Sequence, residues 1–232
     1  MIINIAKHAV IGCVADCVMK RGQGVKRTDR RNELWQFSKS LLEKIMIVQC
    51  TEINKGFADD GKHRVTFMAA VTNLFTQLRQ RQQEGRKGVL HHVALHVLGS
   101  SVLLNRAELM ITAYEEDFLD DTEVSVFWTI DDLTQYVDIG ITEISSPLRK
   151  EFERLQEYEI QEIKQTFLLN YTILMIPFVT ELLPEVFQLP DYAAVDAAPE
   201  VDVVFGELME KVVSLYVHRN NDPADHMIGG YQ

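Results

Sequence analysis

The sequence predicts a helix-dominated α+β fold, in which a small antiparallel sheet at about 89–129 packs against N- and C-terminal helices. Two observations support this fold class. Apolar residues recur at helical spacing before residue 85 and after residue 131, and short β-rich segments lie between these regions. The chain has 232 residues, of which 47% are hydrophobic and 25% charged, so it can bury a core without disulfides or metals.

The first part of the chain, 1–88, is predicted to be helical and basic. Residues 1–20 favour a buried amphipathic helix over a signal sequence, because Lys7 and Asp16 interrupt the apolar run. Two amphipathic helices follow, and Gly85 and Gly88 end the second. Their apolar stripes are Leu34, Phe37, Leu41, Ile45 and Val48, and Val65, Met68, Val71, Phe75 and Leu78.

Residues 89–220 are expected to form a strand hairpin followed by C-terminal helices, in one integrated domain with 1–88. Strands are predicted at 91–98, 108–114 and 123–128, although a short apolar run such as the first could also continue as helix. Asp131 starts a short helix, and Ser146 with Pro147 starts a long one that Pro177 ends or kinks. We expect a last helix at about 203–217 and a flexible tail at 221–232.

Charge is distributed unevenly along the sequence. Residues 1–106 hold 17 Lys+Arg and 8 Asp+Glu, whereas 107–232 hold 6 and 26, so a net charge of −11 divides into +9 and −20. The two parts could be complementary faces of one fold or of two protomers. Alternatively, the basic part recognises an acidic partner, or the acidic part binds cations or a basic protein. The binding candidates are a basic patch of Lys26, Arg27, Arg30 and Arg31 and an acidic patch of Glu115, Glu116, Asp117, Asp120 and Asp121.

The histidine cluster His91, His92 and His96 is the sharpest local feature. On a strand, His92 and His96 share one face, because their spacing is even. A hairpin around Val102 would place Glu108 opposite His96 and Thr112 opposite His92, with Tyr114 on the same face. The candidate catalytic residues are therefore His92, His96, Glu108 and Tyr114, and the candidate metal ligands are His92 and His96. The same polar set is also typical of the solvated face of an ordinary sheet.

Several functional classes are disfavoured. The sequence contains no phosphate-binding loop, dinucleotide-binding glycine pattern, nucleophile elbow or C-x-x-C pair, so no cofactor is expected, apart from a divalent metal at the histidines. Aromatic residues do not interleave with the basic patch and the acidic part would repel phosphate, which argues against nucleic acid. The apolar run at 165–180 is shorter than the ~20 residues that span a bilayer, and it contains Asn170 and Pro177, so no membrane is expected.

Three sparse cysteines, Cys13, Cys17 and Cys50, suit a reducing interior and predict a cytoplasmic protein. We expect a non-catalytic interaction or regulatory protein that self-associates through complementary basic and acidic surfaces. The alternative is a metal-dependent hydrolase or nuclease that uses the histidine cluster and nearby carboxylates.

Overall fold

A computed structural model describes residues 25–58, 60–116, 124–208 and 212–220, and about 60% of these residues are helical. A five-stranded mixed sheet accompanies the helices, so the predicted helix-dominated α+β class is confirmed. The predicted helix at 1–20 and the predicted tail at 221–232 lie outside the described residues. The chain divides into two compact units. Unit 1 comprises Met1–Lys55, Val102–Ala107 and Ile130–Met175, and unit 2 comprises Gly56–Ser101, Glu108–Thr129 and Ile176–Gln232.

Three long helices build unit 1: α3 (Val25–Gly56, as far as Lys55), α6 (Asp131–Glu151) and α7 (Glu157–Leu174). Helices α6 and α7 pack together, and two ion pairs join their exposed sides, Lys164 Nζ to Asp138 Oδ1 at 2.6 Å and Arg149 to Glu157 at 2.6 Å. Each helix buries one apolar stripe, as amphipathic helices do. The largest buried side chains of this core include Leu42 and Ile53 of α3 and Phe167 and Tyr171 of α7.

Close approach in this core depends on Gly140 of α6. A Cβ atom at this position would lie 2.9 Å from Phe167 Cε1 and 3.6 Å from Leu42 Cδ2. A real Cβ does not come so close to a ring carbon, and Phe167 is only 1% exposed, so it has no room to retreat. The missing side chain therefore lets α3 and α7 meet over α6.

Buried polar groups also join the three helices. Gln49 of α3 donates from Nε2 to the backbone oxygen of Tyr136 at 3.1 Å and accepts a hydrogen bond from the Tyr171 hydroxyl. Asn105, in the left-handed conformation (φ 55°) that Asn tolerates better than most residues, accepts from Gln161 of α7 at 3.0 Å and Thr134 of α6 at 3.4 Å. The short segment 102–107 is thus held to unit 1 by specific bonds.

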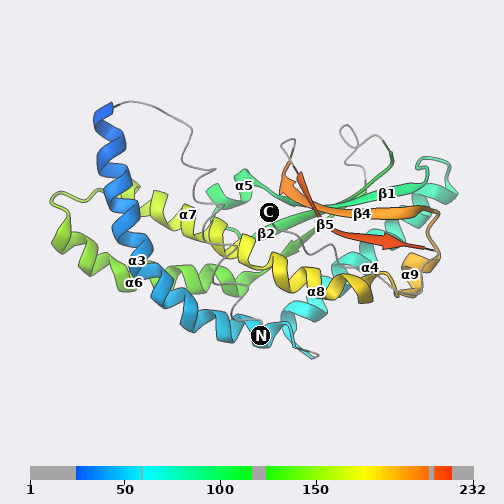
Figure 1. The fold of residues 1–232 in the computed structure, drawn as a ribbon, viewed down its shortest axis with the longest axis horizontal. Coiled ribbons are helices and arrows are strands. Elements are labelled where there is room, and N and C mark those ends of the chain that lie inside the picture. Colours follow the sequence, from blue (N-terminus) through cyan, green and yellow to red (C-terminus); the bar gives the residue numbers. More distant parts are fainter. Residues whose placement is uncertain (1–24, 59, 117–123, 209–211, 221–232) are drawn as a thin grey trace. The chain divides into compact units, whose positions relative to one another are not determined.

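Unit 2 is built on the five-stranded sheet, whose order is β3-β2-β1-β4-β5 (Figure 1). Strand β1 (Leu90–Val97) pairs antiparallel with β2 (Glu108–Tyr114), which pairs antiparallel with β3 (Ser125–Thr129). Helix α5 (Gly99–Leu103) follows β1. On its other side, β1 pairs in parallel with β4 (Ala197–Glu207), and β4 pairs antiparallel with the edge strand β5 (Val212–Arg219). The predicted meander therefore forms three of the five strands.

The remaining helices of unit 2 are α4 (Lys62–Gln83), α8 (Ile176–Val186) and the short α9 (Pro190–Ala193). Helix α4 packs on β2 and β3, where the Trp128 indole donates to Thr66 Oγ1 at 3.0 Å and contacts Phe67 edge-on. Helix α8 packs on β5, and Phe187 just beyond it stacks on His218 with ring centroids 4.3 Å apart. These aromatic contacts anchor the helices to one face of the sheet.

Two helix predictions were wrong. The predicted helix at 203–217 is instead the strand pair β4 and β5, because this stretch holds five Val residues together with Phe205 and Tyr216, a composition that favours strand. Ser146 and Pro147 do not begin a helix, because Pro147 lies inside α6, which runs from Asp131 to Glu151. One lost backbone hydrogen bond near its end does not stop this helix. The turn comes later, at 152–156.

The segment Glu157–Val186, which contains α7 and α8, is long and apolar enough to cross a membrane by length and composition. In this structure 56% of its most apolar window is buried. Core helices of soluble proteins have the same properties, so this segment is weak evidence for a membrane span.

Candidate functional site

The polar side chains that the sequence singled out lie on one face of the unit 2 sheet. Side chains alternate between the two faces along a strand, and Trp128 marks the face that packs against α4. The opposite face carries His92, Ala94 and His96 of β1. In the same order, their pairing partners on β2 are Tyr114, Thr112 and Met110, and their partners on β4 are Asp202, Val204 and Gly206.

His96 is buried, at 2% exposure, and its Nε2 is hydrogen-bonded to the Tyr114 hydroxyl at 3.1 Å. Tyr114 stands opposite His92 in the register rather than opposite His96. Its ring can reach along the strand because the residue between the two histidines is Ala94, and Ala94, Tyr114 and Val204 pack as one buried cluster. Burial lowers the pKa of His96, and the backbone of Gly206 partly opposes this effect. His96 is therefore neutral near pH 7.

His92 has a different environment, because strand β4 places Asp202 beside it as its Cα partner. Burial lowers the pKa of His92, while the Asp202 carboxylate partly opposes the shift and His91 adds to it. Asp202 itself accepts a hydrogen bond from Ser214 Oγ of β5 at 2.5 Å. A partly exposed histidine beside a hydrogen-bonded carboxylate is an arrangement that can bind a proton or one metal coordination site.

The predicted hairpin register was wrong by two residues. His96 lies opposite Met110 and His92 opposite Tyr114, whereas the sequence predicted Glu108 and Thr112 at these places. A shift by two keeps every side chain on its predicted face, because side chains repeat every second residue. Glu108 therefore lies beyond His96, where it accepts hydrogen bonds from Ser101 at 2.7 Å and Thr129 at 3.3 Å.

Within the described part of the chain, this face brings together only part of a metal-binding set. Among the described residues, no group of three or more His, Cys, Asp or Glu side chains is placed to hold a metal ion. His91 lies at an irregularity in the pairing of β1 with β4, between Leu90 and His92. His92 with Asp202 supplies two donors, and His96 uses one nitrogen on Tyr114.

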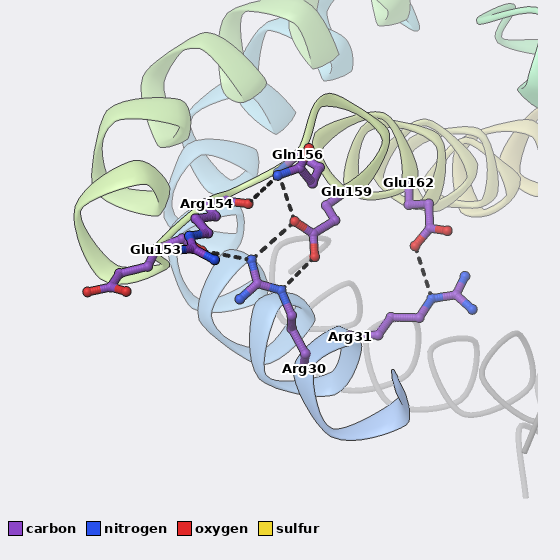
Figure 2. A network of polar contacts seen from close by, with 7 residues as sticks. All are labelled: Arg30, Arg31, Glu153, Arg154, Gln156, Glu159 and Glu162. Carbon is purple, nitrogen blue, oxygen red and sulfur yellow. Dashed lines mark hydrogen bonds and ion pairs between the residues drawn. The ribbon is translucent and has the colours of Figure 1, made fainter. Parts of the chain in front are cut away.

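The described part of the basic patch forms ion pairs within unit 1. Arg30 of α3 donates from Nε to Glu159 Oε1 at 2.7 Å and from Nη2 to Glu159 Oε2 at 3.2 Å, and Arg31 pairs with Glu162 at 3.2 Å. Figure 2 shows the Arg30 guanidinium between Glu159 and the backbone oxygen of Glu153, to which it also donates at 3.2 Å. The side chains of Lys26 and Arg27 lie outside those that the structure describes.

Glu159 is the centre of this network (Figure 2). Its carboxylate accepts the backbone N–H of Gln156 at 2.9 Å and so caps the start of α7. The Arg30 hydrogen bonds and the Gln156 N–H lower the pKa of Glu159 against the opposing effect of its burial. The adjacent Arg154 has a positive φ of 55°, a conformation that costs a non-glycine residue about 1–2 kcal/mol. Its backbone oxygen accepts from Gln156 Nε2 at 2.7 Å, so the network holds this strained corner.

The acidic patch is described only at its start. Glu115 accepts the backbone N–H of Gly88 at 3.0 Å and lies 4.0 Å from Lys87 Nζ, while Glu116 is exposed. Asp117, Asp120 and Asp121 lie outside the described residues. Glu115 therefore has a structural contact with the residues that precede β1.

The fold redistributes the charge that the sequence separates. By sequence, unit 1 holds 15 Lys+Arg and 14 Asp+Glu, a net charge of +1, whereas unit 2 holds 8 and 20, a net charge of −12. Unit 1 is nearly neutral because basic α3 belongs with acidic α6 and α7. The ion pairs of Arg30 and Arg31 are direct instances of this compensation.

Asp202, Ser214 and Glu159 are not among the residues predicted from the sequence. Asp202 and Ser214 alternate with apolar residues, at Val201 and Val203 and at Val213 and Leu215, which is a strand signal. For Glu159, the signal was its position three residues after Gln156, as in a capping box.

No protein-family model, no curated protein and no solved structure matches this chain.

We predict that Glu159→Ala lowers the free energy of unfolding by about 1–2 kcal/mol, because it removes both a helix cap and an ion-pair partner. Glu159→Gln keeps an acceptor for the Gln156 N–H and should cost less.

Because the pKa of Glu159 is lowered in the folded state, its ionic contribution is present above its unfolded pKa and lost as pH falls through the folded pKa. Urea unfolding at pH 7 and pH 3 should show the gap between wild type and Glu159→Gln narrowing in acid. A gap of equal size at both pH values would contradict this role.

A second prediction concerns His96. Its folded pKa lies below the ordinary value of 6.5, so the unfolded chain takes up a proton that the folded chain does not. Stability should be constant above about pH 6.5 and fall as pH decreases below that value. Chemical unfolding between pH 7.5 and 5 should show this decline, and His96→Gln should make it shallower. Parallel curves for wild type and His96→Gln would rule out the histidine as its source.

Proposed function

We propose that this is a cytoplasmic, non-catalytic interaction protein that self-associates through surfaces of opposite charge. The observation that carries the proposal is a surface of α3 on which the exposed charges Lys44 and Glu52 accompany an exposed apolar pair, Ile47 at 57% and Val48 at 71% exposure. Contiguous exposed apolar surface marks interaction sites, whereas single exposed aliphatic residues are ordinary. Cys50 is a free thiol, and sparse cysteines support the cytoplasmic location.

The state of the candidate catalytic residues supports the same proposal. His96 is buried against Tyr114, and Glu108 accepts two hydrogen bonds from neighbouring side chains. Burial raises the pKa of Tyr114, which makes its phenol a weaker acid than usual. Groups held in this way stabilise a sheet, and a substrate would have to displace these bonds to reach them.

Surfaces of both signs remain for partners. Unit 2 carries a net charge of −12, and α3 carries exposed lysines, among them Lys44 and Lys55. The −12 of unit 2 also argues against a nucleic-acid partner, because it would repel a phosphate backbone.

Static light scattering over a concentration and salt series tests self-association. We expect the mean mass to exceed that of the 26.6 kDa monomer at low salt and to fall toward it as salt screens the charges. A monomer at every salt concentration would remove the self-association proposal.

The second candidate function is a metal-dependent hydrolase or nuclease, and the specific observation in its favour is Asp202 beside His92. A carboxylate next to an imidazole supplies two of the donor types that zinc uses. The missing ligands would have to come from water or substrate.

This alternative predicts stoichiometric metal in the purified protein by elemental analysis. The His92→Ala, His96→Ala double variant should lose the metal while keeping its circular dichroism spectrum. Metal-free wild-type protein, prepared without chelators, would count against the enzyme.

A further inference from the structure

Val48 lies away from the face through which α3 joins the core of unit 1. The buried residues of α3 include Leu42, Gln49 and Ile53, whereas Val48 is 71% exposed and its neighbour Ile47 is 57% exposed. The predicted apolar stripe that ends at Val48 therefore extends beyond the core that the helix packs against. An aliphatic surface of this kind gains free energy when a partner covers it.

Opposite charges lie symmetrically about Val48. Residues four apart on a helix share a face, so Lys44 lies one turn before Val48 and Glu52 one turn after it. Lys44 is exposed, and the Glu52 side chain is 53% exposed while bonded to Lys55 of its own helix at 2.7 Å. The row Lys44, Val48, Glu52 is therefore accessible. In an antiparallel copy of this row, each lysine would face a glutamate.

We infer that α3 pairs antiparallel with α3 of a second copy about a twofold axis at Val48. The axis brings the two Val48 side chains together and places Lys44 of each copy opposite Glu52 of the other. A parallel arrangement would face Lys44 with Lys44 and Glu52 with Glu52, which is repulsive. In a twofold contact each interaction occurs twice, because both copies contribute the same residues to the interface. This inference rests on the proposed self-association and specifies its interface.

The contacts between the two α3 helices determine how tightly the dimer is expected to form. Exposed ion pairs contribute about 0.2–1 kcal/mol each, so the two Lys44–Glu52 pairs add a modest, salt-dependent attraction to the aliphatic contact and select the antiparallel orientation. A single helix pair buries less than the ~800 Å² per partner that is typical of stable complexes. The dimer should therefore be weak, concentration-dependent and sensitive to salt.

Sedimentation velocity of the full chain with charge variants tests the geometry. Lys44→Glu and Glu52→Lys should each raise the dimer dissociation constant about tenfold, because each creates two like-charge contacts. The double variant Lys44→Glu, Glu52→Lys should restore dimerisation, since the antiparallel pairs are simply exchanged. Lys39→Glu is the matched control, because Lys39 pairs with Glu43 along its own helix and does not share the face of Val48. Val48→Asp should abolish the dimer.

Cysteine cross-linking provides an independent readout of the axis. In a Cys13→Ser, Cys17→Ser, Cys50→Ser background, Val48→Cys should form an intermolecular disulfide on oxidation with diamide, because the axis brings a residue next to its own copy. Asn54→Cys, exposed on another side of α3, should not do so under the same conditions.

The outcomes separate the interface from the function. A dimer that persists unchanged in Val48→Asp and in both single charge variants overturns the α3 interface and leaves self-association standing. Failure of the charge exchange to restore dimerisation overturns the antiparallel register. A wild-type monomer at every concentration overturns both the interface and the proposed self-association.

Discussion

The parallel pairing of β1 with β4 is the constraint on which unit 2 depends. It joins residues more than one hundred positions apart, places β1 in the centre of the sheet, and continues the meander with a second strand pair. Gln82 at the end of α4 supports this pairing at its start, because its side chain donates to the backbone oxygens of Gly88 and Asp196, both at 2.7 Å. The amide of Asp196 donates back to Gln82 at 2.9 Å. One glutamine thus holds together the chain segments that lead into both central strands.

The polar face of the sheet follows from the same pairing. Asp202 reaches His92, and Gly206 reaches His96, only because β4 lies alongside β1 in this register. Where β4 presents a carboxylate, the neighbouring histidine is partly exposed and electrostatically supported. Where β4 presents a glycine, the histidine is buried. Desolvation lowers the pKa of both histidines, but only at His92 does a carboxylate oppose the shift. Two histidines on one strand therefore differ in their chemistry because of their neighbours across the sheet.

Unit 1 depends on a different principle, the compensation of charge between helices. Arg30 reaches the first turn of α7, where Glu159 caps the helix and accepts the guanidinium at the same time. A carboxylate near a helix N-terminus is also favoured by the helix dipole, so cap, ion pair and dipole act on one side chain. The remaining exposed charges of α3, such as Lys44, are those from which we infer an interface.

The sequence by itself determined the helix-dominated α+β class, the three strands of the meander and the faces of their side chains. These features depend on local periodicity, so the face of each strand stayed correct even where the hairpin register was wrong by two residues. Tertiary structure alone decided that β4 lies beside β1, because this pairing joins strands that are far apart in the sequence. It also decided that Pro147 remains inside a helix, that Asp202 is beside His92, and that Arg30 and Arg31 pair with α7. The pairings of β4, Asp202, Arg30 and Arg31 are long-range contacts, and neither helical nor strand periodicity carries information about the partner.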